Sequence, residues 1–142
     1  MIRHPNRWYP EEIFAAVVTV LLVLTSGYFA VLSVVAPGMV VRGGDTHAAR
    51  VFGGYATARS VVLLGALAWA AATRHRPALP LLLALNGLVQ AGDILVGVPQ
   101  HDLMRILGPA GATVALFAAA VTTARGRRGV RLPSRTPDPA PR

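Results

Sequence analysis

The sequence has 142 residues, which suffices for one domain. Hydrophobic residues make up 54% of the chain and charged residues only 14%, whereas a soluble domain averages about 25% charged residues. The net charge is +8 and cysteine is absent, which excludes disulfides, thiolate metal sites and cysteine nucleophiles. This composition predicts a membrane protein.

Four hydrophobic runs follow one another along the chain, each close to the roughly 20 residues that a helix needs to cross a bilayer. They cover residues 13–36, 51–73, 78–98 and 103–124. The first contains no charged residue, whereas the second is interrupted by Arg59. Because short connections favour antiparallel neighbours, we expect residues 1–124 to form an all-α, integral membrane four-helix bundle with antiparallel up-down topology.

The C-terminal segment, residues 125–142, reads RGRRGVRLPSRTPDPAPR and is rich in arginine and proline. It has no apolar periodicity, so we expect a disordered tail. Arginines near a membrane surface attract anionic lipids by about 1 kcal/mol each, so lipid is the expected partner of this tail. We expect no nucleic acid, because the arginines outside the tail flank hydrophobic runs, apart from one inside a run, and form no groove-reading face.

The distribution of arginine predicts the orientation in the membrane. Ten arginines fall on the side that holds both termini and the connection between the second and third runs: Arg3, Arg7, Arg74, Arg76 and six in the tail. Three fall on the opposite side, at Arg42, Arg50 and Arg105. The positive-inside rule therefore places both termini in the cytoplasm. Heavy use of Ala, Val, Leu, Gly and Arg without lysine suggests a bacterial plasma membrane protein.

Polar residues interrupt the third run at helical spacing. Asn86, Gln90 and Asp93 are four and three residues apart, so they share one face of a helix. Arg59 in the second run is the expected partner of Asp93, since the two lie about 12 Å and about 7 Å from the outer ends of their runs. Tyr55, one turn before Arg59, faces the same way. We expect an intramembrane polar cluster of these five residues.

Two interpretations of this cluster remain open. Paired polar groups can fix the register of neighbouring helices, and this interpretation predicts a dry, fully paired Arg59–Asp93 interior. Ionisable residues within a membrane can also mark a path for an ion, a proton or a ligand, which predicts a pocket that opens outward and reaches Arg59, Gln90 and Asp93. We favour the first, because four helices leave little interior for a transport path.

No motif in the sequence predicts catalysis. Asp45, His47, His101 and Asp102 lie in the two outer connections and could conceivably hold zinc, but they lack the HExxH spacing. Solvated loop residues are the simpler interpretation, so we expect no metal and no cofactor. The serines of the runs have no histidine nearby in the sequence, so no nucleophile–base pair is predicted.

The stretch RVFGGYATARSVVLLGALAW at residues 50–69, with its glycine-rich start and intramembrane arginine, precedes LNGLVQAGDILVG at residues 85–97 and a last run rich in Gly and Ala. In this order of features, residues 13–124 resemble the DoxX-like superfamily of small four-helix bacterial membrane proteins, which includes subfamilies of unknown function. The resemblance implies a bundle in the plasma membrane, sometimes associated with redox or quinone-linked complexes. It does not supply a reaction.

The sequence as a whole predicts a non-enzymatic accessory subunit or homo-oligomer of the plasma membrane. The alternative is a small-ligand, quinone or ion binder or carrier that uses the intramembrane cluster at Arg59, Asn86, Gln90 and Asp93.

Overall fold

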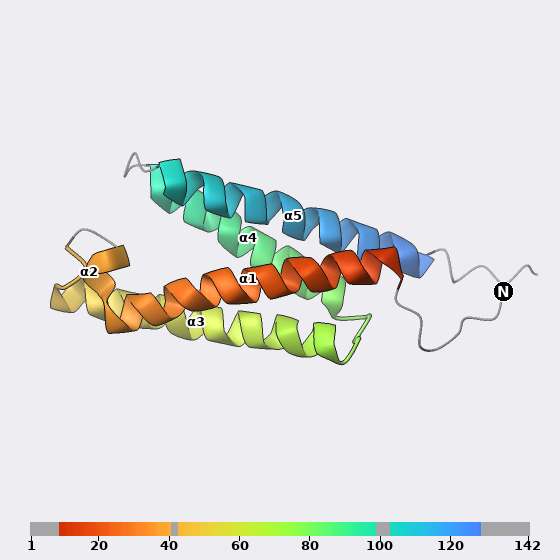
Figure 1. The fold of residues 1–142 in the computed structure, drawn as a ribbon, viewed down its shortest axis with the longest axis horizontal. Helices are drawn as coiled ribbons and strands as arrows, with labels where there is room; N and C mark the ends of the chain where they lie inside the picture. Colours follow the sequence, from red (N-terminus) through yellow and green to blue (C-terminus); the bar gives the residue numbers. More distant parts are fainter. Residues whose placement is uncertain (1–8, 41–42, 99–102, 129–142) are drawn as a thin grey trace, which may run out of the picture.

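The fold consists of helices throughout the described part of the chain. The structure is a computed structural model that describes residues 9–40, 43–98 and 103–128. Its helices are α1 (Pro10–Val35), α2 (Pro37–Val40), α3 (His47–Ala72), α4 (Leu79–Gly97) and α5 (Leu103–Arg128). All but the short α2 are long and apolar enough to cross a membrane, and they run alternately in opposite directions (Figure 1). The predicted all-α class with four candidate membrane spans is confirmed.

Helices α1, α3 and α5 each extend beyond the predicted hydrophobic run at one end. Helix α3 begins at His47 because Thr46 caps it, its hydroxyl accepting the backbone N–H of Ala49 at 3.3 Å. Helix α5 continues to Arg128, four residues into the segment predicted to be disordered. The rest of that tail, residues 129–142, lies outside the described residues, so its disorder and its lipid contacts stay predictions.

The chain reverses between α3 and α4 through a Schellman turn. The N–H of His75 donates to the carbonyl of Ala70 at 2.8 Å, and the N–H of Arg74 donates to Ala71 at 3.2 Å. Arg74 adopts a φ of 53°, the left-handed conformation that this motif requires and that glycine usually provides. The turn brings Arg76 to the beginning of α1.

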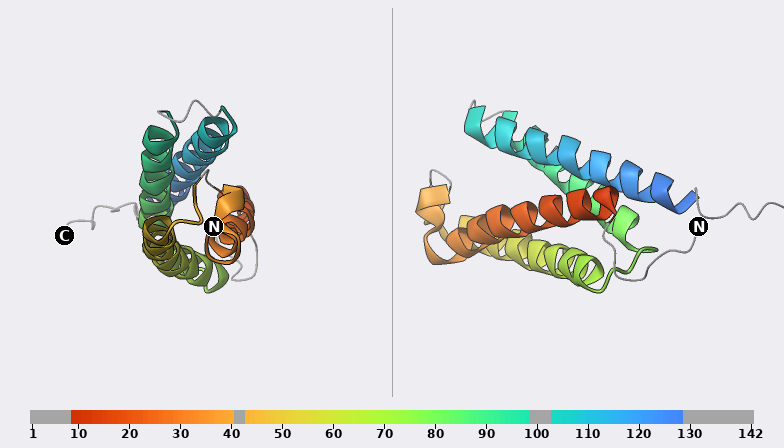
Figure 2. Two further views of the ribbon diagram at one scale, coloured as in Figure 1. Left: turned by 90° about the vertical axis from the view of Figure 1, so that its left-hand side faces the viewer. Right: turned by 45° about the vertical axis from the view of Figure 1, so that its right-hand side comes forward.

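The long helices form two hairpins, one of α1 with α3 and one of α4 with α5 (Figure 2). Within the second hairpin, Gly87 allows close approach, because a Cβ added there would lie 3.3 Å from the ring of Phe117. Between the hairpins, α1 packs on α5 somewhat more extensively than α3 packs on α4.

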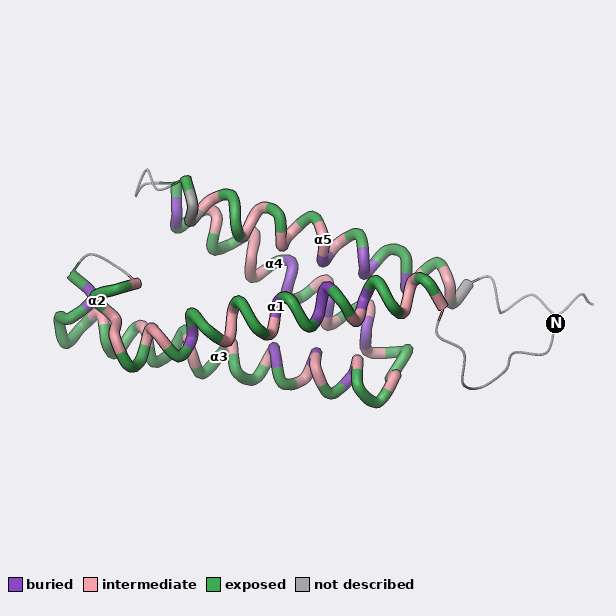
Figure 3. Tube along the Cα trace, viewed as in Figure 1, coloured by how far each residue is buried: buried purple, intermediate pink, exposed green. Residues whose placement is uncertain are grey.

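The buried core occupies the half of the bundle where α1 begins and α5 ends, which we call the terminal end (Figure 3). Leu67, Leu83 and Leu116 are completely buried there. The remaining core residues are Ala15, Val18, Leu22, Leu64, Ala70, Leu79, Ala119 and Ala120. Toward α2 the hairpins diverge (Figures 1 and 2), and we call this the open end.

Large apolar side chains cover much of the outer surface. Leu24, Val62, Leu88 and Val114 are each at least 60% exposed, and they come from all four long helices. A monomeric soluble protein rarely exposes so many large apolar side chains. Acyl chains of a bilayer solvate such residues, so this surface is the one expected of an integral membrane protein.

Candidate functional site

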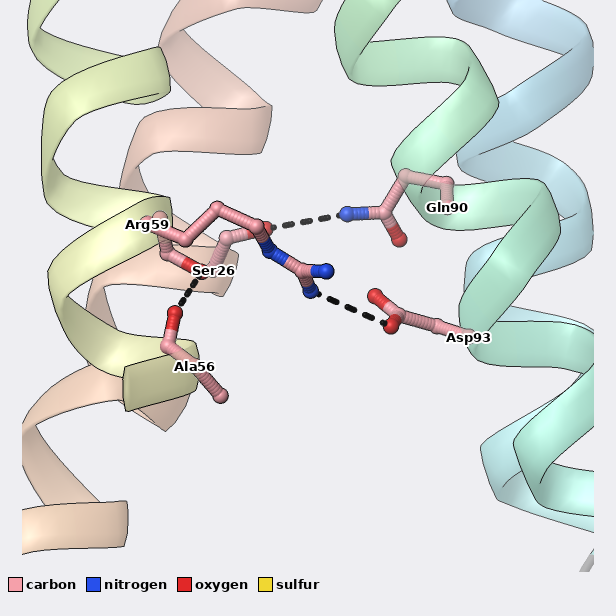
Figure 4. A network of polar contacts seen from close by, with 6 residues as sticks. Ser26, Ala56, Arg59, Gln90 and Asp93 are labelled. Carbon is pink, nitrogen blue, oxygen red and sulfur yellow. Dashed lines mark hydrogen bonds and ion pairs between the residues drawn. The ribbon is translucent and has the colours of Figure 1, made fainter. Parts of the chain in front are cut away.

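Arg59 and Asp93 face one another across the space between α3 and α4 (Figure 4). An Nη of Arg59 lies 3.9 Å from an Oδ of Asp93, within ion-pair range but too long for a hydrogen bond. The side chains remain 55% and 47% exposed. The pair therefore lies at the edge of the open end, beyond the apolar core, and not in a dry interior.

Arg59 lies deeper along its helix than the sequence suggested. Because α3 begins four residues before the predicted run, Arg59 is about 18 Å from the first residue of the helix. Asp93 is about 6 Å from Gly97 at the end of α4. If α3 spans the membrane, the backbone of Arg59 thus lies close to the middle of the bilayer.

The two amides predicted to extend the pair behave differently. Gln90 donates from Nε2 to the hydroxyl of Ser26 at 3.4 Å, which links α4 to α1 (Figure 4). Asn86 is only 4% exposed and donates to the carbonyl of Leu82 in its own helix at 2.9 Å. Ser26 was not part of the predicted cluster, although it is a small polar residue within the first run. Side chains along the polar face of α4 thus become more exposed from Asn86 to Asp93.

No polar contact among the described residues joins Tyr55 to the ion pair, so its place in the cluster stays a prediction. Its side chain is 72% exposed, and the described contacts include no hydrogen bond between it and Arg59. Ser60, next to Arg59, donates to the carbonyl of Ala56 in its own helix at 2.9 Å. The structure therefore brings together Arg59, Asp93, Gln90 and Ser26, and we call these four residues the fork cluster.

The best-formed cavities among the described residues lie away from the fork cluster. The two best-formed cavities among the described residues measure about 40 Å³ and about 20 Å³, and both lie at the terminal end around Glu12, Arg76 and Leu79. Neither is lined by a residue of the fork cluster. Pockets for small organic ligands usually measure about 300 Å³ or more.

A second polar cluster joins the beginning of α1 to the turn before α4 at the terminal end. Arg76 pairs with Glu12 at 2.5 Å, and the guanidinium lies 5.7 Å from the ring centre of Tyr9. The other carboxylate oxygen of Glu12 accepts the backbone N–H of Tyr9 at 3.4 Å, one half of a capping box. We call Tyr9, Glu12 and Arg76 the terminal clasp. The sequence showed Glu12 only as an acidic residue in the first helical turn, with no sign of its partner.

The conceivable metal site receives no support from the described residues. Asp45 lies 3.9 Å from Arg50, with both side chains exposed, and His47 begins α3. His101 and Asp102 lie outside the described residues. Within the part of the chain that the structure describes, no group of three or more His, Cys, Asp or Glu side chains could hold a metal ion.

Comparison of the sequence with protein-family models and with curated proteins, and of the structure with solved structures, found no match. The resemblance to the DoxX-like superfamily therefore stays a prediction. What the chain does must be argued from the fork cluster, the terminal clasp and the apolar surface around them.

Proposed function

We propose that this protein is a non-enzymatic accessory or homo-oligomeric subunit of a bacterial plasma membrane, DoxX-like in build, with both termini in the cytoplasm. The four apolar helices support the membrane assignment. The half-exposed Arg59–Asp93 pair carries the rest of the proposal, because it leaves polar atoms on a surface that lipid does not solvate well.

The energetic argument concerns the position of the two charges. Arg59 lies near the middle of α3, and an arginine at the centre of a spanning helix costs about 2.5–3.5 kcal/mol on the translocon scale. An ion pair at 3.9 Å without a hydrogen bond offsets only part of that cost. Hydrocarbon offers no hydrogen-bonding groups. A protein surface that covers the pair would supply them, as expected of a subunit that works in an assembly.

The alternative is a small-ligand, quinone or ion binder. One observation favours it, namely that the charged groups of Arg59 and Asp93 remain accessible between the diverging hairpins. The small size and distant position of the two best-formed cavities argue against it.

The mass of the purified protein in mild detergent tests the proposal. We expect the 14.9 kDa chain to elute with additional copies or with another membrane protein, as measured by light scattering corrected for detergent. Replacing both charges, Arg59→Leu with Asp93→Leu, should leave the chain folded and release it as a monomer.

The matched control is Arg50→Leu with Asp45→Leu, which removes a pair of the same 3.9 Å separation at the start of α3. The control should keep the wild-type mass. A wild-type chain that is monomeric without partners and whose melting temperature rises with a quinone or another small ligand would contradict the proposal and favour the alternative.

A further inference from the structure

The fork cluster presents a cation and an anion side by side on an accessible surface. We propose that its partner is a second copy of this chain, arranged so that Arg59 of each copy pairs with Asp93 of the other across a two-fold axis. This inference rests on the proposed function and names the partner at the same site.

The first argument is charge complementarity. A two-fold interface brings the same patch of both copies together, so it is stable only when the patch complements itself. One exposed arginine beside one exposed aspartate meets this requirement, because rotation places each charge opposite its counterion. A patch of a single sign would repel its own copy.

The second argument is the unused hydrogen-bonding capacity of the pair. A guanidinium carries five N–H donors, and a carboxylate accepts on two oxygens. Among the described residues, the contact between Arg59 and Asp93 is a single approach of 3.9 Å, too long for a hydrogen bond. A second copy would add bidentate arginine–carboxylate hydrogen bonds, which are stronger and more specific in geometry than ordinary neutral hydrogen bonds.

The third argument concerns the surroundings of Arg59 on α3. Phe52, Tyr55 and Val62 follow its helical face at spacings of three and four residues, and each is at least 70% exposed. Lipid or a neighbouring helix could cover these side chains equally well. A protein surface would also supply acceptors for Arg59, which acyl chains lack. The small size of the best-formed cavities favours a helix over a small molecule.

A charge-reversal experiment in co-expressed copies separates pairing between chains from pairing within one chain. Arg59→Asp alone or Asp93→Arg alone places like charges on both sides of the proposed interface. Each variant alone should weaken dimerisation by at least about tenfold, because like charges facing one another across an interface are strongly unfavourable. Co-expressed with different affinity tags, the two variants should form a mixed dimer that co-purifies through both tags.

The opposite result is equally clear. If the pair acts only within one chain, each single variant carries its own repulsion whichever chain it meets. Mixing would then rescue nothing, and only the double variant R59D/D93R would behave like the wild type. That result would overturn the inference. Arg50→Asp and Asp45→Arg, co-expressed in the same way, are the matched control and should leave the dimer unchanged.

Cysteine cross-linking covers the case in which a charge-reversed chain fails to fold. The natural chain has no cysteine. Arg59→Cys in one copy and Asp93→Cys in a differently tagged copy should therefore give a dimer under a short thiol-reactive cross-linker only if the two positions meet between copies. The control combines Arg59→Cys with Leu24→Cys, because Leu24 is exposed on α1. If the Arg59→Cys and Asp93→Cys pair gives no more cross-linked dimer than this control, the inference is overturned.

The same measurements distinguish this inference from the proposed function. If the protein is a dimer and both charge-reversed variants still dimerise, the pairing of Arg59 with Asp93 between copies is refuted. The proposal of an oligomeric subunit would still stand. A wild-type monomer with no partner would refute both.

Discussion

Among the described residues, one arginine–carboxylate pair at each end of the bundle joins segments far apart in the sequence, yet these two pairs differ in geometry. At the terminal end, Arg76 and Glu12 lie 2.5 Å apart above a continuous apolar core, and Tyr9 contacts both. At the open end, Arg59 and Asp93 lie 3.9 Å apart where the hairpins diverge. The carboxylate side chain is 14% exposed in the first pair and 47% exposed in the second.

The difference shows that the surroundings of an ion pair decide what it can do. The terminal clasp joins the beginning of α1 to the turn before α4, and the helices there are already held together by buried leucines. The fork cluster has no comparable core around it, so its charges stay available to a partner. Three substitutions, taken from the largest expected effect to the smallest, probe this comparison.

Removal of a core leucine should have the largest effect. Leu67→Ala or Leu83→Ala leaves a cavity in the terminal half, where both side chains are completely buried. We expect a loss of about 2 kcal/mol in the free energy of unfolding, at the low end of the range for soluble cores because lipid also solvates leucine. Unfolding in detergent micelles by a denaturing surfactant measures it.

Leu88→Ala is the matched control, since Leu88 belongs to the same helix as Leu83 and is 60% exposed. It should change stability by less than about 0.5 kcal/mol. Equal losses for Leu83→Ala and Leu88→Ala would show that the core is not concentrated at the terminal end.

Loss of the terminal clasp should have an intermediate effect. Glu12→Ala removes the partner of Arg76 and the acceptor for the Tyr9 N–H. Because Arg76 is 44% exposed, the pair is partly screened, and we expect a cost of about 1 kcal/mol. Thermal unfolding in detergent should show the loss, together with faster hydrogen exchange at the first turn of α1.

Glu11→Ala provides the comparison for Glu12→Ala, because Glu11 shares the first helical turn and its favourable position at the helix N-terminus. We expect a clearly smaller loss for Glu11→Ala. If both variants lose the same stability, the acidic first turn alone explains the effect, and the clasp contributes nothing.

The smallest effect is expected from a single hydrogen bond between α3 and α1. Thr57 donates from its hydroxyl to the carbonyl of Ala30 at 3.3 Å. Thr57→Val keeps the shape and should cost about 0.6 kcal/mol, the average for such bonds in membrane bundles. Ser60→Ala, which removes only a bond within one helix, should be nearly neutral in the same assay.

Much of the fold could be predicted from the sequence, because hydrophobic runs report which segments can cross a bilayer. The contact between Arg59 and Asp93 could also be anticipated from helical periodicity and approximate depth. Both rest on local patterns along single helices. The helix ends could not be predicted from the apolar runs alone, because capping by Thr46 extends α3 beyond its run.

The divergence of the hairpins could not be predicted, because it depends on how side chains of all four helices fill the space between them. For that reason it could not be predicted that Arg59 and Asp93 would be half exposed, or that Asn86 would bond within its own helix. The partnership of Glu12 with Arg76 likewise depends on the turn after α3. Distant residues meet only once the hairpins are placed.

The two-hairpin arrangement also has a consequence for biosynthesis. Neighbours in the sequence make most of the packing in each hairpin, so α1 and α3 can associate before α4 has left the ribosome. Helices α4 and α5 then arrive as a second unit that docks at the terminal end. A chain built in this order forms its first hairpin early, and the core of its terminal end is completed only when the last turns of α5 have been made.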